Sequence, residues 1–563
     1  MAEEVLKDPN RTCTRHLTLS LLAVALLSSL GSSLLYGYNL AVVNSPALYI
    51  KDFYNQTIVR HYGSGVDEEH LTLFYSITVS IFAIGGLLGS LTVGIQVTTF
   101  GNEASDPRIN LFLLISSISN VYKIYLHACN RKTLLCKATL CVCLICRKGT
   151  LIRSTVLVFV GGGLMGFSRL CGSPEMIIIG RFITGIHSGI SLSVVPMFLG
   201  EMAPKNLRGF LGLMPSIFIC LGVFIAQVLG LHVILGKEEF WPLLLSLVIL
   251  PTFIQLVFLS WFPESPRYLL IEKQNIHATI TALKWYRVKC NIQAEVEEMQ
   301  EEQRTLTSVK TVSVFQLFKD SSVCWQLITI IVVNAGMQLS GIDAIWFYTN
   351  SIFENVGIPA HQIQYTTVGT GAIEVIAGLI DCFIIERVGR RPLMIAGFSF
   401  MCICCAGITF SLQLQTHVSF MHYISVICVV GIIAGFCIGP AGVSLLLTGE
   451  LFKQSHRPAA YIVGGFLNWI SNFTVGFVFP FLQMSAGAFC YLVFCGVCVG
   501  VVLYVYFVVP ETKNKTFVEI SQMFALKNRC EIEKEPLAIT DQLSLKKMNG
   551  YGSVVTADLE KSS

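Results

Sequence analysis

Long apolar stretches separated by short polar segments run through most of this chain. The stretches are about 20 residues long, enough to cross a bilayer as a helix, and six occur in each half. The twelve predicted spans lie at residues 17–45, 72–100, 150–171, 175–199, 210–235, 241–262, 322–353, 362–385, 393–414, 422–449, 459–483 and 487–509. The pattern predicts an all-α membrane protein with many crossings.

The second half of the chain repeats the loops of the first half in the same order. The loop Glu201–Arg208 corresponds to Glu450–Arg457, and Glu264 in Pro263–Arg267 corresponds to Glu511 in Pro510–Lys513. The offsets are nearly equal, 249 (450 − 201) and 247 (511 − 264). Two parallel repeats of six spans are typical of a two-bundle transporter.

This duplication predicts how the chain is divided. We expect an N-terminal six-helix bundle at 1–262, a helical linker at 263–321, a C-terminal six-helix bundle at 322–509 and a tail at 510–563. The linker and the tail are polar and rich in charged residues, so both are expected outside the membrane.

Basic residues predict the orientation of the chain. They cluster in loops that follow an even number of spans, and by the positive-inside rule these loops and both termini face the cytoplasm. The segment between the first two spans carries Asn55-Gln56-Thr57. This triplet can be glycosylated only on the opposite side, so Asn55 is a predicted glycosylation site.

Composition narrows the functional class further. Of the 563 residues, 53% are apolar and 13% are charged, about half the charged share of a soluble protein. The net charge is +4 with the basic residues spread over short loops, which does not favour a nucleic-acid partner. Most of the 20 cysteines lie in apolar runs, so we expect small packing residues rather than a disulfide framework.

One segment departs from the repeat. In the second half, Glu386–Arg391 runs unbroken between two spans, whereas its counterpart is split between Gly101 and Arg147, with 45 residues (146 − 101) in between. An additional span there would place the later basic loops outside, against the positive-inside rule. Residues 102–146 are therefore predicted to be non-native sequence, such as a retained intron, with a cytoplasmic insertion or a re-entrant pair as the alternative.

The repeated loops also predict a charged network. Arg and Glu side chains at helix ends can pair across the two bundles and hold one conformation until the bundles move. Simple anchoring by basic residues would explain the Arg and Lys residues but not the Glu residues. Tyr348, in the seventh span, is a candidate gating residue. The candidates for the cytoplasmic network are Arg181, Glu201, Arg208, Glu386, Arg390, Glu450 and Arg457.

Several motifs together identify a family. They are Gly180-Arg181-Phe182, Pro263-Glu264-Ser265-Pro266-Arg267, Gln338-Leu339-Ser340-Gly341, Gly389-Arg390-Arg391 and Pro510-Glu511-Thr512-Lys513. Over residues 16–101 and 147–525 the chain resembles facilitative sugar transporters of the major facilitator superfamily, and within them the branch of fructose and urate transporters. The resemblance implies twelve helices in two bundles, a central solute site and alternating access without nucleotide hydrolysis.

Polar residues inside spans are candidates for the solute site, because they are costly in lipid unless they face protein or water. Gln338 and Asp343 lie in the seventh span. Glu374 belongs to a stripe on the eighth span formed by Gly371, Glu374, Gly378 and Asp381. The periodicity places these four residues on one helix face.

The resemblance adds further site residues. Tyr36, Asn468 and Trp469 match polar and aromatic positions that hexose carriers use, whereas Ser216, Asp343 and Glu374 stand where those carriers have amides. A buried sugar hydroxyl left unpaired costs about 1–3 kcal/mol. The predicted site is therefore less well matched to sugars than that of a dedicated glucose carrier.

These observations predict a facilitative uniporter for a hexose such as glucose or fructose, in the plasma membrane. The alternatives are a urate transporter, a proton-coupled sugar symporter that uses Glu374, and a non-transporting solute sensor. The loops contain no nucleophile, metal or nucleotide motif, so neither an enzyme nor a cofactor is expected. The expected partners are a small polar solute and the lipid bilayer, with no obligate protein partner.

Overall fold

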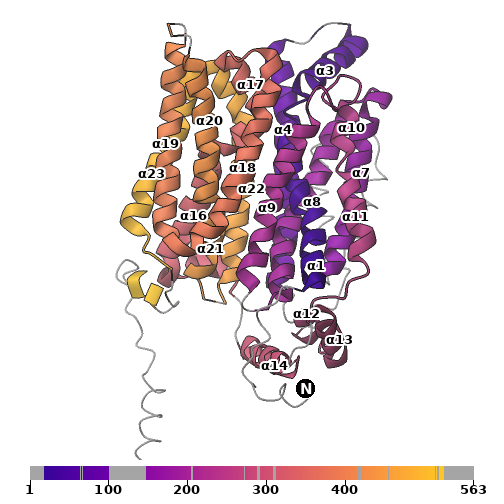
Figure 1. Cartoon of the computed structure of the whole chain (residues 1–563), viewed down its shortest axis with the longest axis vertical. Helices are drawn as coiled ribbons and strands as arrows, with labels where there is room; N and C mark the ends of the chain where they lie inside the picture. Colours follow the sequence, from indigo (N-terminus) through magenta and orange to yellow (C-terminus); the bar gives the residue numbers. More distant parts are fainter. Residues whose placement is uncertain are drawn as a thin grey trace, which may run out of the picture.

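The structure is a computed structural model that describes residues 18–99 and 147–524, apart from short gaps within both ranges. The predicted insert at 102–146 and most of the predicted tail lie outside the described residues. Within the described ranges the chain forms helices and no strands, so the predicted all-α class is confirmed (Figure 1).

The N-terminal half supplies the first six spans, and the first and sixth spans are each divided between two helices. α3 is a further helix between the first and second spans. The described helices are α1 (Leu19–Leu30), α2 (Ser33–Ala41), α3 (Ala47–Tyr62), α4 (Glu68–Thr99), α7 (Arg147–Cys171), α8 (Glu175–Met202), α9 (Arg208–Leu229), α10 (Trp241–Ser246) and α11 (Ile249–Leu259).

The C-terminal half supplies the other six spans, and the seventh and tenth spans are again divided. Its described α-helices are α16 (Cys324–Leu339), α17 (Ile342–Val356), α18 (Ala360–Val388), α19 (Arg390–Leu414), α20 (Met421–Ile438), α21 (Pro440–Leu451), α22 (Arg457–Ala486) and α23 (Cys490–Val508).

The described residues contain the twelve predicted spans. Eleven helical segments are long and apolar enough to cross a membrane. The last of them, Arg457–Val508, contains both α22 and α23. Because an α-helix satisfies its backbone hydrogen bonds internally, it is one of the two structures that can span lipid.

The two divided spans of the C-terminal bundle break at a glycine and at a proline. Gly341, between α16 and α17, has a φ of +97°, a left-handed conformation that is accessible to glycine and costly for other residues. Pro440 follows Gly439 and begins α21; proline lacks the backbone N–H that would continue α20. Both breaks lie inside the C-terminal bundle, where protein rather than lipid surrounds the irregular backbone.

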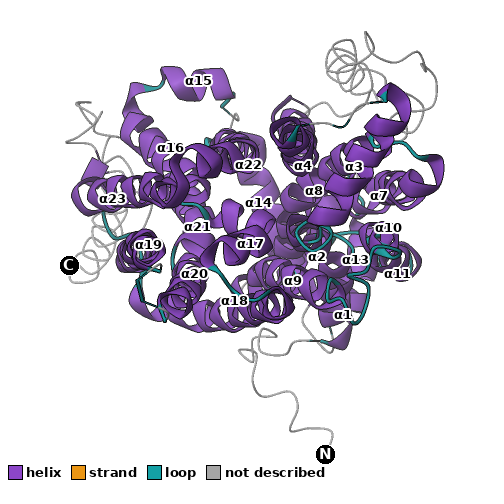
Figure 2. Ribbon diagram, turned by 90° about the horizontal axis from the view of Figure 1, so that it is seen from above, coloured by secondary structure: helices purple, strands orange, loops and turns teal. Residues whose placement is uncertain are grey.

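The two halves form bundles that lie side by side (Figure 2). In the N-terminal bundle α8 packs on α4 and α7, and α2 packs on α9. In the C-terminal bundle α19 packs on α20 and α23, and α16 packs on α22. Three pairs of helices join the bundles: α4 with α22, α9 with α18 and α2 with α17. A solute site shared by the halves is therefore expected among these helices.

Glycines bring α4 and α8 unusually close. A Cβ built on Gly185 would lie 2.1 Å from the carbonyl oxygen of Phe82, and one on Gly189 would lie 2.0 Å from that of Gly86. A Cβ on Gly85 would meet the Phe182 carbonyl oxygen at 2.1 Å. Small residues that let backbones approach closely are a common basis of helix association in membranes. The α4–α8 contact is therefore a fixed part of the N-terminal bundle.

We expect Gly185→Ala to destabilise the folded protein by about 1–3 kcal/mol, the usual cost of overpacking, because the new methyl group meets backbone rather than a movable side chain. Thermal unfolding of the purified protein measures the effect. Gly163→Ala on α7 is the matched control, since its Cβ would meet nothing within 4 Å. Equal unfolding temperatures for the two variants would contradict the proposed role of the close contact.

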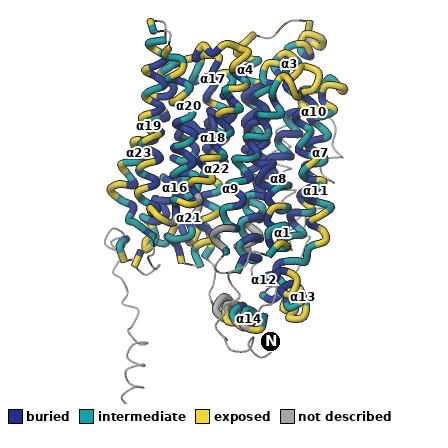
Figure 3. Tube along the Cα trace, viewed as in Figure 1, coloured by how far each residue is buried: buried dark blue, intermediate teal, exposed yellow. Residues whose placement is uncertain are grey.

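The linker between the bundles forms short helices at one end of the molecule, opposite α3 (Figure 1). They are α12 (Pro266–Ile271), α13 (Ile276–Tyr286), α14 (Ile292–Ser308) and α15 (Val314–Lys319). Figure 3 shows exposed residues on α13 and α14 and a buried interior between the bundles.

Specific hydrogen bonds attach the linker to both bundles. The Nη2 atom of Arg287 donates to the Met202 carbonyl at 3.0 Å, and Arg287 also pairs with Glu295 at 2.8 Å. On the other side, the backbone N–H of Val312 donates to the Ser455 carbonyl at 3.0 Å. The linker end of the molecule is thus tied to α8 and to the loop before α22.

Candidate functional site

Buried polar side chains gather where the C-terminal bundle faces the N-terminal bundle. The Gln338 amide donates to Asn468 Oδ1 at 2.6 Å, and the Asn472 amide donates to Asp343 Oδ1 at 2.7 Å. Gln338 lies at the end of α16 and Asp343 in the first turn of α17, so the break at Gly341 brings both to the same helix, α22. Four amide and carboxyl groups therefore form one cluster.

A second part of the cluster lies between α17, α18 and α9. The indole N–H of Trp346 donates to Glu374 Oε2 at 3.1 Å, and the Cys220 sulfur of α9 lies against α18, 3.4 Å from a Cβ built on Gly378. Gln227, two turns after Cys220, lies against Gly371, where a Cβ would be 2.2 Å from Gln227 Oε1. Gly371 and Gly378 of the eighth-span stripe thus face α9 of the N-terminal bundle, whereas Glu374 contacts Trp346 of its own bundle.

Several oxygen acceptors of this cluster have no hydrogen-bond partner among the described residues. They are Gln227 Oε1, Gln338 Oε1, Asp343 Oδ2, Glu374 Oε1 and Asn472 Oδ1. All five side chains are buried. Unpaired buried acceptors are rare in proteins, and these five can accept hydrogen bonds from a bound solute or from water.

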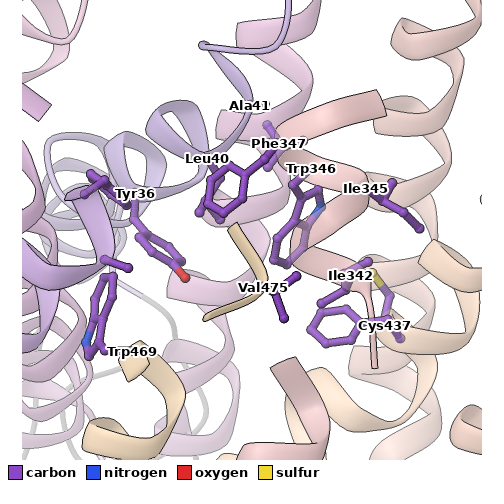
Figure 4. Close-up of a cluster of buried hydrophobic side chains, with 14 of the residues drawn as sticks. Tyr36, Leu40, Ala41, Ile342, Ile345, Trp346, Phe347, Cys437, Trp469 and Val475 are labelled. Carbon is purple, nitrogen blue, oxygen red and sulfur yellow. The ribbon is translucent and has the colours of Figure 1, made fainter. Parts of the chain in front are cut away.

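Aromatic rings lie at the same interface, and Figure 4 shows Tyr36, Trp346 and Trp469 among the buried side chains there. Tyr36 of α2 contacts Trp469 edge to face, with ring centroids 5.6 Å apart. Trp346 makes an edge contact with Phe436 at 5.5 Å. Flat apolar faces beside polar groups are the usual composition of small-molecule sites.

Trp469 also connects the bundles. Its indole N–H donates to Ser90 Oγ of α4 at 2.7 Å, and its ring fills the space that a Gly86 side chain would occupy, 2.2 Å from a built Cβ. Of the predicted site residues, Gln338 contacts Asn468 and Asp343 contacts Asn472 of the same helix. Tyr36 contacts Trp469 across the bundles, and Glu374 contacts Trp346. Ser216 is exposed on α9, one turn before Cys220.

A separate set of contacts joins the bundles toward the α3 end. Asn44 Oδ1 accepts the backbone N–H of Asn350 at 3.0 Å, and the Asn44 amide donates to Asn350 Oδ1 at 3.3 Å. The rings of Tyr75 and Tyr348 pack edge to face at 6.1 Å. The Tyr348 hydroxyl donates to the Gly476 carbonyl at 2.6 Å. In this structure the two bundles are closed against each other at this end.

Tyr348 also marks a distortion in α17. Its backbone is non-helical, with φ −131° and ψ 20°, so the second half of α17 changes direction at this residue. The ring of Tyr348 lies between Tyr75 of one bundle and Phe479 of the other, the latter at 5.5 Å. This position suits the predicted gating residue.

The predicted place of Arg181 in the cytoplasmic network is wrong. Arg181 lies 21 residues before Met202 on α8, a rise of about 30 Å, and Met202 is the residue that contacts the linker. The Arg181 guanidinium is fully buried and donates to the carbonyls of Asn39, Thr78 and Val79 at 2.7, 3.4 and 3.3 Å. The prediction placed Arg181 at the linker end of the molecule because the charge of a residue does not show how far along its helix it lies.

The predicted pairing of loop charges across the bundles is also not what the structure shows for Arg390. Arg390 pairs with Glu450 at 3.0 Å, and both residues belong to the C-terminal bundle. Arg457 donates through Nε to the nearby Phe452 carbonyl at 3.0 Å. Glu201 is half-buried at the end of α8. The side chains of Arg208 and Glu386 lie outside the described residues.

The repeated Pro-Glu motifs have the same structural role in each half. Glu264 Oε1 accepts the backbone N–H of Lys148 at the start of α7 at 2.9 Å. Glu511 accepts the N–H groups of Arg390 and Arg391 at the start of α19, both at 3.1 Å. Burial raises the pKa of the Glu264 carboxyl, and the Lys148 amide acts in the opposite direction. Each glutamate thus satisfies free amides at a helix start.

Sequence reasoning missed three residues of the cluster. Asn472 follows Asn468 by one helical turn, and this spacing was a usable signal for a second amide on the same face. Gln227 and Cys220 lie seven residues apart on α9, which also places them on one face. They were missed because one amide and one thiol do not form a clear polar stripe in an apolar span.

Comparisons with known proteins agree with this geometry. The family described as "Sugar (and other) transporter" matches residues 24–137 and 135–524. The human "Solute carrier family 2, facilitated glucose transporter member 9" is 43% identical over 524 residues, which is 93% of this chain and 89% of that protein. Member 5 of the same group from Bos taurus is 42% identical over 514 residues, 91% of this chain and 94% of that protein.

Solved structures show the same fold. The proton:xylose symporter XylE bound to 6-bromo-6-deoxy-D-glucose superimposes with a TM-score of 0.67 at 18% identity, covering 90% of this chain and all of that one. The inward-open conformation of the xylose transporter XylE from E. coli gives 0.66 at 20% identity, covering 89% and 99%. At these identities the likeness concerns the fold alone.

Proposed function

We propose, from the premise that this chain belongs to the sugar transporter family, that it carries a hexose across a membrane by facilitated diffusion. The two relatives described above are named facilitated glucose transporters. Glucose and fructose are the first candidates, and the proposed site is the polar cluster between the bundles.

The observation that carries this proposal is the set of unpaired buried acceptors. Gln227, Gln338, Asp343 and Asn472 each present an oxygen with no partner among the described residues. A hexose supplies several hydroxyl donors at once, and each buried acceptor it satisfies removes a cost of about 1–3 kcal/mol. Tyr36, Trp346 and Trp469 offer aromatic faces to the sugar ring.

The charges in the cluster favour a neutral solute. Asp343 and Glu374 are both buried, and an anion beside an ionised carboxylate is strongly repelled where the dielectric is low. Urate, the second candidate solute, is an anion and would require Glu374 to be neutral or paired. A hexose has no such requirement.

Among the described residues, the contacts of Arg181 include no carboxyl group that could couple proton movement to transport. The groups that its guanidinium contacts are backbone carbonyls, the Asn39 side-chain oxygen at 3.4 Å and the Phe82 ring at 4.8 Å. None of these groups takes up a proton near neutral pH. Proton coupling would therefore have to use a carboxyl elsewhere, with Glu374 the first candidate.

We propose that transport follows alternating access. In this structure Asn44–Asn350 and Tyr75–Tyr348 close the α3 end. Movement of one bundle against the other would break these contacts and close the linker end instead. Tyr348, at the distortion of α17, is the proposed gating residue, and the charged pairs of the repeated loops would brace each bundle as it moves.

The orientation stays as predicted from the basic loops. The linker end would face the cytoplasm together with both termini, and the α3 end, with Asn55, would face the exterior of the plasma membrane. Asn55 is half-buried on α3, and the Thr57 hydroxyl donates to the Phe53 carbonyl at 2.8 Å. Glycosylation at Asn55 would therefore have to precede folding of this helix.

Uptake into liposomes tests the proposal. The full chain and the chain without residues 102–146 are each supplied with labelled glucose, fructose or urate. We expect saturable hexose entry that follows the solute gradient and is unaffected by a pH gradient. Entry of urate alone would support the second candidate, accumulation driven by pH would support symport, and background entry of all three solutes by both chains would overturn the proposed function.

A further inference from the structure

The last helix of the linker carries two exposed phenylalanines. On α15, Phe315 is 83% exposed and Phe318 is 58% exposed, whereas Leu317 between them is fully buried against the protein. Large apolar side chains exposed together mark a surface that meets another protein, a ligand or a membrane. The two rings therefore point to a partner outside the described chain.

The two rings lie on one side of α15. Phe315 and Phe318 are three residues apart, so they are neighbours on the surface of the helix. Gln316 lies on another side, where its side chain accepts the backbone N–H of Ser313 at 3.0 Å in a capping box. The helix thus has one side toward the protein at Leu317, one apolar side and one polar side.

Contacts on both sides of α15 hold the helix in place. Before it, the backbone N–H of Val312 donates to the Ser455 carbonyl at 3.0 Å. After it, Asp320 Oδ2 lies 3.3 Å from His456 Nε2. Ser455 and His456 are neighbours in the loop before α22, and α15 packs on α22. The helix is therefore attached to the C-terminal bundle at both of its ends, and its apolar side stays outside.

The ends of two spans place α15 at the level of the membrane surface. The apolar segment of the seventh span begins at Ser321, and α15 ends at Lys319. α22, on which α15 packs, begins a second such segment at Arg457. Tyr461, one turn into α22, is also exposed, and aromatic residues are enriched where spans leave the hydrocarbon. Figure 2 shows α15 at the outer edge of the C-terminal bundle, beside α16 and α22. Its apolar side therefore continues the surface that these spans present to lipid.

We propose that α15 is a membrane-interface helix whose partner is the lipid bilayer. Phe315 and Phe318 insert between the acyl chains just below the headgroups, where amphipathic helices bury their apolar side. Lys319, exposed next to Phe318, places its ammonium group at the level of the lipid phosphates. The bilayer thus covers the two rings and holds the C-terminal end of the linker at the membrane surface.

Two other exposed residues provide matched references. Phe410 on α19 is 65% exposed within the membrane-spanning segment Arg390–Leu414, so its ring faces lipid. Glu297 on α14 is also exposed, and Figure 1 shows α14 beyond the ends of the spans. The first residue gives the signal of a lipid contact and the second that of a linker position in water.

Photocrosslinking in liposomes tests the proposal without any solute. Benzoylphenylalanine, a photoreactive analogue of phenylalanine, replaces Phe315, Phe318, Phe410 or Glu297 of the full chain, one in each variant. The proteins are placed in liposomes of phosphatidylcholine and phosphatidylserine, irradiated and digested, and mass spectrometry identifies what each substituted peptide has joined. We expect phospholipid adducts at the Phe315 and Phe318 positions in amounts comparable with those at Phe410, and none at Glu297.

Three results would overturn the proposal. The Phe315 and Phe318 positions could join no lipid, as expected for Glu297, which would place α15 in water. They could instead join a peptide from a second copy of the chain, which would assign the apolar side of α15 to self-association. Lipid adducts at Glu297 as abundant as those at Phe315 would show that lipid reaches the linker without regard to the exposed rings.

Discussion

Asn472→Asp is expected to remove most of the solute uptake of this protein. The substitution replaces the amide that donates to Asp343 Oδ1 at 2.7 Å with a second carboxyl group. Two buried carboxylates at that distance repel each other, so the pair would hold a proton or separate. A loss of about 1–3 kcal/mol in solute binding, which corresponds to roughly five- to more than one-hundred-fold in affinity, should appear as a raised KM for uptake.

The exchanged pair is the control for this prediction. In the double variant Asp343→Asn with Asn472→Asp, an amide and a carboxylate again face each other with their positions reversed. We expect the double variant to recover a substantial part of the uptake lost by Asn472→Asp alone. If the double variant is as impaired as the sum of its single changes, the hydrogen bond between these residues does not organise the site.

Replacement of Arg181 is expected to have the largest effect on the folded protein. Its guanidinium bridges the carbonyls of Asn39, Thr78 and Val79 in a fully buried position. Arg181→Ala would leave these carbonyls without that donor, and each buried acceptor left unsatisfied costs about 1–3 kcal/mol. Arg181→Lys keeps the charge but loses the planar fork of donors, so we expect it to be destabilised as well.

The yield of monodisperse protein and its thermal unfolding measure these two variants. Arg153→Ala is a suitable comparison, because Arg153 lies exposed on α7. The predicted order of stability is native and Arg153→Ala, then Arg181→Lys, then Arg181→Ala. A fully stable Arg181→Lys would show that the bridging of several carbonyls is dispensable.

The sequence was sufficient to predict the spans and the duplication. A long apolar segment in lipid forms a helix, because a helix satisfies its own backbone hydrogen bonds. The twelve spans therefore follow from the composition and length of the apolar segments. The sequence repeat also indicated equivalent positions in the two halves. Glu264 and Glu511 occupy such positions, and each accepts backbone N–H groups at the start of a helix, α7 or α19. Local sequence encodes such contacts directly.

The partners of buried polar residues were harder to predict. Gln338, Asp343 and Glu374 were identified because polar groups are rare in spans, but the sequence did not show that Asn472 and Trp346 are their partners. Arg390 was expected to reach the other bundle and instead pairs with Glu450 in its own. Such choices depend on how helices distant in sequence pack together, which no local pattern records.

The two divided spans of the C-terminal bundle have an electrostatic consequence. Asp343 lies in the first turn of α17, after the break at Gly341. Asp381 lies against the first turn of α21, where a Cβ on Gly442 would be 2.7 Å from Asp381 Oδ2. The N-terminal end of a helix carries about half a positive charge from its aligned peptide dipoles. Each break therefore directs a partial positive charge at a buried acid, and the interior can hold both carboxyl groups without a lysine or arginine beside them.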